Sequence, residues 1–231
     1  MRLVPAVLAP LLVAAAVALG TPAAGHGSPG AAALVSHRTT TALTAFTWSQ
    51  RRVTAADLPA TWRTGCPVPP SALRALTLRF YGFDGHSHLG VLVVGTTTVP
   101  AVVSVFRRLY AQRFPIRRMI PIDAYDGNDD RSVAADNTSA FNCRKAVTSG
   151  PAHWSMHAYG QAIDINPVEN PYVEGHLVTP PAGIEFVNRS RPRPGMVLAG
   201  RTVVADFAAV GWGWGGVWSD RDYQHFSTNG H

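Results

Sequence analysis

The feature that most constrains this chain is an aspartate set inside an apolar strand pattern. The residues Ala162-Ile163-Asp164-Ile165 alternate in the way that predicts a β-strand, with Ala162 and Asp164 on one face. A carboxylate between two isoleucines is costly to bury unless it is paired or bound to a metal ion. We therefore expect Asp164 to have polar partners from elsewhere in the chain.

Two histidines are the candidate partners. His157 lies seven residues before Asp164, a spacing too long for one helical face but suited to a loop that bends at Tyr159-Gly160 and enters a strand. His225 lies far downstream in Asp222-Tyr223-Gln224-His225. Two histidines and an aspartate can fill three positions of a zinc tetrahedron and leave the fourth for water.

Asp222 is the candidate general base for such a site. It precedes His225 by three residues, and residues three apart in a strand point to opposite faces. We therefore expect Asp222 to lie on the turn before the last strand, so that both side chains reach one metal. The alternative is an exposed polar turn followed by a partly buried histidine.

The N-terminal residues 1–24 resemble a secretory signal. Arg2 forms a short positive region, Leu3 to Leu19 is apolar, and small residues follow. The alternative is an uncleaved membrane anchor, but the run is short for a span and contains Pro5 and Pro10. We expect a secreted protein that is not inserted in a membrane after signal removal.

The rest of the chain fits one domain with an N-terminal extension. We expect an arm or linker over residues 25–65 and a catalytic domain over residues 66–231. The net charge of +6 predicts association with anionic cell-wall polymers, although the charge could serve only solubility. The chain has no Lys/Arg-rich run of the kind that binds nucleic acid, so we expect no nucleic-acid partner. We also expect a monomer.

Cys66 and Cys143 are the only cysteines. Export permits a disulfide between them, and the alternative is two buried free thiols. A bridge would connect the upstream part of the domain to the segment before His157.

The hydrophobic pattern mixes helices and strands without a regular alternation of the two, which favours the α+β class. We expect a hairpin over residues 76–83 and 89–94, and helices from residue 98 to before 115 and over 203–210. Further strands are expected over 116–122, 139–144, 162–165 and 223–226, with a polar loop over 123–137 and an irregular excursion over 166–194.

Four stretches together resemble the M15 zinc peptidases. They are residues 137–144 (NTSAFNCR), residues 154–167 (WSMHAYGQAIDINP), residues 170–173 (NPYV) and residues 222–226 (DYQHF). The resemblance covers about residues 66–227 and is nearest to the group with phage endolysin L-alanyl-D-glutamate peptidases. D-alanyl-D-alanine carboxypeptidases are relatives.

The resemblance implies a role for each matching residue. His157, Asp164 and His225 match the zinc ligands, and Asp222 matches the general base. Arg144 resembles the arginine that stabilises the developing oxyanion.

Substrate contacts are expected from Ser155, Tyr159 and Trp214. The family fold is a small α+β domain with a central antiparallel sheet flanked by helices, of the Hedgehog/DD-peptidase type. This sequence departs from the family pattern at Ser227, a position where relatives often carry an acidic residue.

We therefore expect a secreted zinc peptidase that hydrolyses peptidoglycan stem peptides. A carboxypeptidase would have to recognise a terminal carboxylate, for which Arg131, Arg144 and Arg189 are candidates, whereas an endopeptidase would need an open groove. The sequence leaves this choice open. The alternative function is a non-catalytic zinc-containing module that binds the cell wall.

Overall fold

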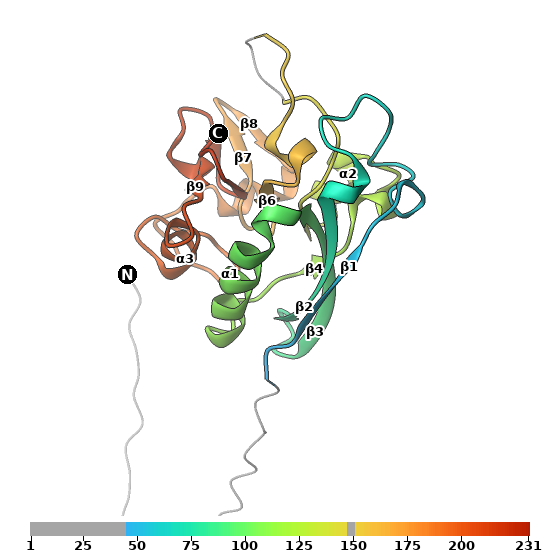
Figure 1. The fold of residues 1–231 in the computed structure, drawn as a ribbon. Coiled ribbons are helices and arrows are strands. Elements are labelled where there is room, and N and C mark those ends of the chain that lie inside the picture. The colour runs from blue at the N-terminus through green and yellow to red at the C-terminus, as the bar shows by residue number, and fades with distance from the viewer. Residues whose placement is uncertain (1–44, 147–150) are drawn as a thin grey trace, which may run out of the picture. The chain divides into compact units, whose positions relative to one another are not determined.

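A long antiparallel hairpin builds the first half of the fold (Figure 1). The computed structural model describes residues 45–146 and 151–231. Strand β2 (Leu73–Tyr81) pairs with β3 (Ser87–Gly95), and β1 (Trp48–Arg52) pairs with the other edge of β2. This confirms the predicted hairpin, although both strands are longer than the pattern indicated.

Both faces of the hairpin are apolar, because alternate residues of β2 enter different clusters. Leu76 and Leu78 face the main core, where helix α1 (Val99–Ala111) packs against them through residues such as Phe106. Leu73 and Ala75 belong to a smaller cluster with Phe141 and Cys143 on the opposite face. The hairpin therefore connects the main core to the segment that precedes the candidate site.

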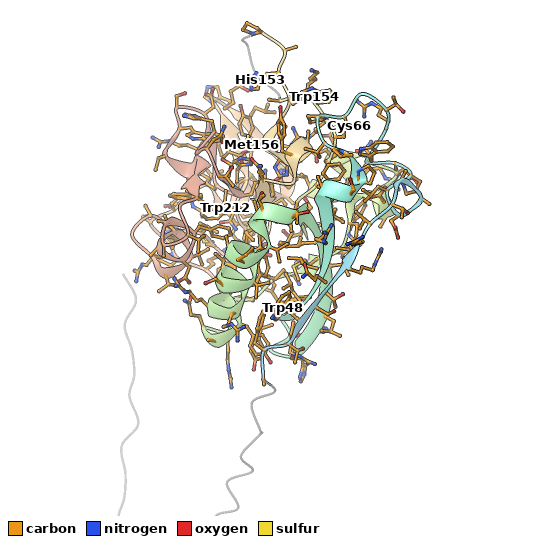
Figure 2. The ribbon with its side chains drawn as sticks, viewed as in Figure 1. Trp48, Cys66, His153, Trp154, Met156 and Trp212 are labelled. Atoms are coloured by element: carbon orange, nitrogen blue, oxygen red, sulfur yellow. A yellow bond between two sulfur atoms is a disulfide. The ribbon has the colours of Figure 1, made fainter. Side chains whose placement is uncertain are left out.

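The predicted disulfide between Cys66 and Cys143 is present. Cys143 is buried, and its backbone N–H donates to the carbonyl of Thr61 while its own carbonyl accepts from Arg63. Cys66 and Trp154 lie at the same end of the molecule, with Trp48 at the other (Figure 2). The bridge thus fixes the start of the domain to the strand-like segment beside the site.

Part of the predicted N-terminal arm is integrated into the fold. Within residues 25–65, β1 extends the hairpin sheet, and Asp123 accepts hydrogen bonds from the backbone of Ala60 and Thr61. The described residues belong to one compact unit, Leu43–His231. The predicted signal over residues 1–24 lies outside the described residues.

The middle of the chain departs from the predicted loop over 123–137. It contains a 3-10 helix (Ile122–Tyr125) and helix α2 (Asp129–Ala134). The side chain of Asn128 caps α2 by accepting from the backbone N–H of Arg131, and two acidic residues fill the first turn. Strands β4 (Arg118–Met119) and β5 (Asn137–Thr138) flank this region and pair in parallel, so the strands expected over 116–122 and 139–144 are shorter or displaced.

The second half of the fold carries two small sheets. β6 (Ala162–Asp164), β11 (His225–Ser227) and β9 (Gly213–Trp214) form one sheet in the order β6-β11-β9. β10 (Arg221–Asp222), β7 (Tyr172–Glu174) and β8 (Leu177–Thr179) form the other. The excursion over 166–194 is therefore not wholly irregular, since it contains the β7–β8 hairpin and a 3-10 helix (Pro181–Phe186).

Helix α3 (Thr202–Ala208) closes the main core from the second half. Its Phe207 stacks on Phe226 of β11 at a ring-centroid distance of 3.8 Å, and both side chains are fully buried. Ile163 and Ile165 enter the same cluster as α1 and the hairpin. The strand that carries Asp164 is thus anchored on both sides by apolar packing.

The structure confirms a mixed α+β class but not one central sheet. The described residues form three three-stranded sheets and a two-stranded parallel pair. Short strands cover separate parts of the core, because turns and 3-10 helices interrupt the chain between them. Over the described ranges, no helix is both long and apolar enough to cross a membrane.

Candidate metal centre

His157 is fixed by a short helix rather than by a loop. It lies in the 3-10 helix Met156–Tyr159, where the Ser155 hydroxyl caps the start by accepting from the His157 N–H at 3.3 Å. Gly160 ends the helix with a left-handed φ of 65°, and its carbonyl accepts from the Gly95 N–H at the end of β3. The expected bend at Tyr159-Gly160 is confirmed, and the hairpin holds it in place.

Asp164 and His225 meet across one antiparallel strand pair. In the register of β6 and β11, His225 lies directly opposite Asp164, and Phe226 lies opposite Ile163. Directly opposite side chains in such a pair share one face of the sheet. The apolar residues at 163 and 226 fill the core, which turns Asp164 and His225 together to the other face.

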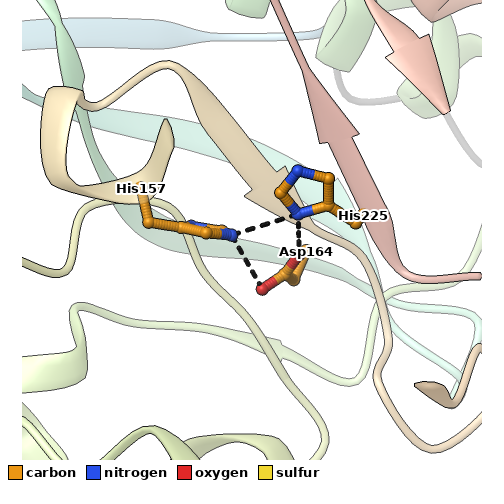
Figure 3. Close-up of side chains that lie close together, drawn as sticks. All are labelled: His157, Asp164 and His225. Atoms are coloured by element: carbon orange, nitrogen blue, oxygen red, sulfur yellow. Dashed lines mark hydrogen bonds and ion pairs between the residues drawn. The ribbon is translucent and has the colours of Figure 1, made fainter. Parts of the chain in front are cut away.

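The three predicted ligands converge on one point (Figure 3). His157 Nε2 lies 3.1 Å from Asp164 Oδ2, His225 Nδ1 lies 3.1 Å from Asp164 Oδ1, and the two ring nitrogens are 3.2 Å apart. All three side chains are buried, and one donor atom from each lies within 4.8 Å of the others. Two imidazole nitrogens and one carboxylate oxygen form a donor set that zinc prefers.

A backbone contact selects the tautomer of neutral His157. Its Nδ1 lies 2.5 Å from the carbonyl of Ala140, which accepts only from a protonated nitrogen. The unprotonated Nε2 of the neutral ring then faces Asp164 and His225. Such an outer contact is the usual way to orient a metal-binding histidine, so these residues fit a metal ion.

The electrostatics of the cluster favour a cation. Burial opposes a charged His157, but the Asp164 carboxylate raises the pKa of the imidazole above its ordinary value despite this. Burial likewise opposes ionised Asp164, yet His157 and His225 hold the pKa of this carboxyl well below its usual range. A buried carboxylate kept ionised by its surroundings is suited to bind a positive ion.

Asp222 lies beside the cluster, but not on a turn as predicted. It ends β10, where it pairs with Tyr172 of β7, so it belongs to a different sheet from His225. Among the described residues its buried Oδ1 has no hydrogen-bond partner. Burial raises the pKa of Asp222 to about 6, while His225 lowers it and Asp164 raises it. A carboxyl in this position can accept a proton near neutral pH.

Arg144 reaches the edge of the same site. Its backbone carbonyl accepts from the Ser155 N–H at 3.1 Å, and its guanidinium Nη2 lies 3.0 Å from Asp129 Oδ2. Burial and Asp164 dominate the pKa of His157, and Arg144, which lowers it, and Asp129, which raises it, contribute less. Sequence reasoning missed Asp129, although the cap at Asn128 and the adjacent acidic pair are signals of a helix start.

The three predicted substrate contacts have different surroundings. Ser155 is buried and its hydroxyl is used to cap His157, and Tyr159 is half-buried on the same 3-10 helix. Trp214 is a core residue that packs on Phe226 and donates its indole N–H to the carbonyl of Tyr223. A role for Trp214 in substrate binding therefore gains no support from its position.

The arginines considered for carboxylate recognition also differ. The guanidinium of Arg189 donates to the carbonyls of Glu169, Phe186 and Val197 and to the Asn170 side chain, so this residue is structural. Arg131 forms an exposed ion pair with Asp126 at 2.7 Å. Arg144 is the member of the trio whose backbone contacts Ser155, two residues before His157.

A cavity of about 350 Å³ lies away from this centre, between the hairpin turn and β4. Phe83, His88, Arg117 and Ile120 are among its lining residues, and none of the three predicted ligands is.

Two buried histidines and a buried aspartate around one point are a group that can hold a metal ion. Residues 148–228 match a family model described as D-alanyl-D-alanine carboxypeptidase, from the M15 peptidases. The match supports an M15-family peptidase, as the motif predicted. It covers Asp222 and the three ligands and ends short of Arg144 and Asp129 on the upstream side. No curated protein and no solved structure matches the chain.

Proposed function

We propose that this chain is a secreted zinc peptidase that hydrolyses peptide bonds in the stem peptides of peptidoglycan. The convergence of His157, Asp164 and His225 inside the family match carries the proposal. Zinc would be held by His157 Nε2, an Asp164 oxygen and His225 Nδ1. The predicted signal over residues 1–24 supports export to the cell wall.

The residues around the cluster have separate roles in the proposed hydrolysis. Zinc supplies a Lewis acid that activates water and polarises the scissile carbonyl. Asp222 accepts the proton of the attacking water while the new C–O bond forms. Arg144 donates hydrogen bonds to the carbonyl oxygen as it gains negative charge. Asp222 then returns the proton to the amine when the C–N bond breaks.

The test uses the chain from residue 25, loaded with zinc and incubated with purified muropeptides. Mass spectrometry of the products identifies the bond: release of a single terminal alanine indicates a carboxypeptidase, and cleavage within the stem an endopeptidase. The variants His157→Ala and Asp222→Asn should lose activity. Asp220→Asn, an exposed aspartate two residues from the base, is the matched control and should stay active. Full activity in either site variant would refute the mechanism.

We propose that anionic wall polymers bind a second surface, the arginine face, made of Arg79, Arg107 and Arg113. Arg107 and Arg113 lie over the rings of Phe46 and Tyr81, at 5.2 and 5.4 Å from their centroids. Within residues 45–146 and 151–231, none of the three arginines forms an ion pair with a carboxylate. Their charge is therefore free to attract a polyanion.

The arginine face lies at the opposite end of the hairpin from the metal centre. Arg79 donates to Ser87 at the start of β3, while Gly95 at its end binds Gly160 beside His157. At about 3.3 Å per residue, the length of β3 separates them by about 25 Å. A polymer bound there leaves the catalytic site open.

The test is salt-dependent binding to poly(glycerol phosphate). Replacing Arg79, Arg107 and Arg113 with glutamine should weaken binding about tenfold and flatten its dependence on salt. The same change at three exposed arginines elsewhere (Arg52, Arg191 and Arg201) is the matched control. Equal loss in both triple variants would show that only net charge matters and would overturn the assignment.

A further inference from the structure

Among residues 45–146 and 151–231, the guanidinium of Arg144 has one charged partner, Asp129. Its Nη2 is 3.0 Å from Asp129 Oδ2, and each side chain is 29% exposed. Its Nη1 makes a longer contact of 3.4 Å with the Lys145 carbonyl, and its buried Nε has no acceptor in the described part of the chain. Asp129 therefore provides the short contact that fixes the direction of the guanidinium.

Arginine needs such a contact because its side chain is long. Holding its rotamers in one geometry costs conformational entropy. Without an acceptor at residue 129, the partly exposed guanidinium of Arg144 gains access to solvent-facing rotamers. A smaller fraction of molecules would then present Arg144 toward the ligands.

Asp129 is itself fixed from two directions. It is the first residue of α2, whose start is capped by Asn128. Its other oxygen, Oδ1, accepts from the side chain of Asn142 at 3.3 Å, and the backbone N–H of Asn142 donates to the carbonyl of His157 at 3.2 Å. Asn142 is buried and adjoins the disulfide-bonded Cys143. One hydrogen-bonded path thus connects α2, the arginine and the metal-binding histidine.

We infer that Asp129 is a positioning residue for the hydrolysis, acting through Arg144 rather than on the substrate. This inference rests on the proposed peptidase function and on the role of Arg144 in it. Asp129 exchanges no proton: the proton from water goes to Asp222 and then to the leaving amine. Asp129 keeps the Arg144 guanidinium where the carbonyl oxygen becomes negative.

The experiment is a double-mutant cycle on the zinc-loaded chain with Asp129→Asn, Arg144→Ala and the double variant. Asparagine keeps the shape of Asp129 and an oxygen for Asn142 but removes its charge. We expect Asp129→Asn to lower kcat by about 10- to 100-fold with little change in KM, zinc content or melting temperature. In the Arg144→Ala background, the same substitution should have no further effect. Asp130→Asn, on the exposed next residue of α2, is the matched control and should behave as wild type.

A second readout separates this inference from the proposed function. The Nε–H signal of Arg144, assigned by its loss in Arg144→Lys, reports the order of the guanidinium by NMR relaxation without any substrate. It should become more mobile in Asp129→Asn and stay unchanged in Asp130→Asn. An unchanged signal, or a kcat loss that adds fully to that of Arg144→Ala, would overturn the inference. An inactive wild type with the expected NMR change would refute the peptidase function and leave the positioning contact supported.

Discussion

Glu169 and Asp136 make the stability of this fold dependent on pH. Glu169 is 3% exposed, and Asp136 is 6% exposed. The two carboxyls interact, while Arg117 Nη2 lies 3.8 Å from Glu169 and Arg117 Nε lies 3.5 Å from Asp136. Burial, followed by the hydrogen bond to Asp136 and its charge, raises the pKa of Glu169 from 4.5 to about 8. The folded protein therefore holds a proton at Glu169 that the unfolded chain releases at lower pH.

The sign and size of the effect follow from this difference in proton binding. Between about pH 4.5 and pH 8 the folded state binds more protons than the unfolded state, so the free energy of unfolding falls as pH rises. Each unit of pKa difference corresponds to about 1.4 kcal/mol, so the change from 4.5 to about 8 corresponds to about 5 kcal/mol. Below pH 4.5 and above pH 8 the contribution of this group is constant.

Glu169→Gln tests this reasoning, because glutamine resembles the protonated acid and can donate to Asp136. Urea unfolding at pH 5, 7 and 9 should show that the variant matches wild type at pH 5 and exceeds its stability by roughly 2–4 kcal/mol at pH 9. Glu185→Gln, at an exposed glutamate, is the matched control. Parallel pH dependences for wild type and Glu169→Gln would refute the argument.

Three further outcomes follow from the structure. His157→Ala should reduce bound zinc from one ion per chain to a small fraction, measured by elemental analysis after dialysis; stoichiometric zinc would contradict the ligand assignment. Replacing Cys66 and Cys143 with serine should lower the free energy of unfolding, measured by urea denaturation, by about 4 kcal/mol. An unchanged midpoint of the urea unfolding curve would exclude a stabilising bridge. Phe207→Ala, which removes a ring stacked on Phe226, should cost about 3–5 kcal/mol, whereas a loss below 1 kcal/mol would contradict its place in the core.

Regular local patterns predicted the elements that have one apolar face. The β2–β3 hairpin, α1, α3 and β6 each repeat apolar residues with a period of two or 3.6, and each lies near its predicted position. By contrast, every residue of β1 is exposed, so its sequence carries no alternation and its partner β2 alone makes it a strand. The segment with α2 was predicted as a loop because its polar composition obscured the helix-capping signal at Asn128.

The sequence by itself indicated the residues of the candidate site. Residue type, spacing and order mark His157, Asp164, Asp222 and His225 as candidates, and the resemblance to the M15 peptidases implies their roles as ligands and base. The strand pattern around Asp164 also showed that its carboxylate needed a partner. These properties belong to individual residues and short segments, which a sequence displays directly.

Only the tertiary structure decided how those residues meet. The register of β6 with β11 sets His225 opposite Asp164, β7 holds the strand of Asp222, and α2 supplies Asp129 to Arg144. Asp129 and Arg144 are 15 residues apart in the sequence, and Asp164 and His225 are 61 residues apart. Their contacts depend on which apolar faces are buried together. Local periodicity specifies a face for burial, but the packing of distant faces determines which polar side chains become neighbours.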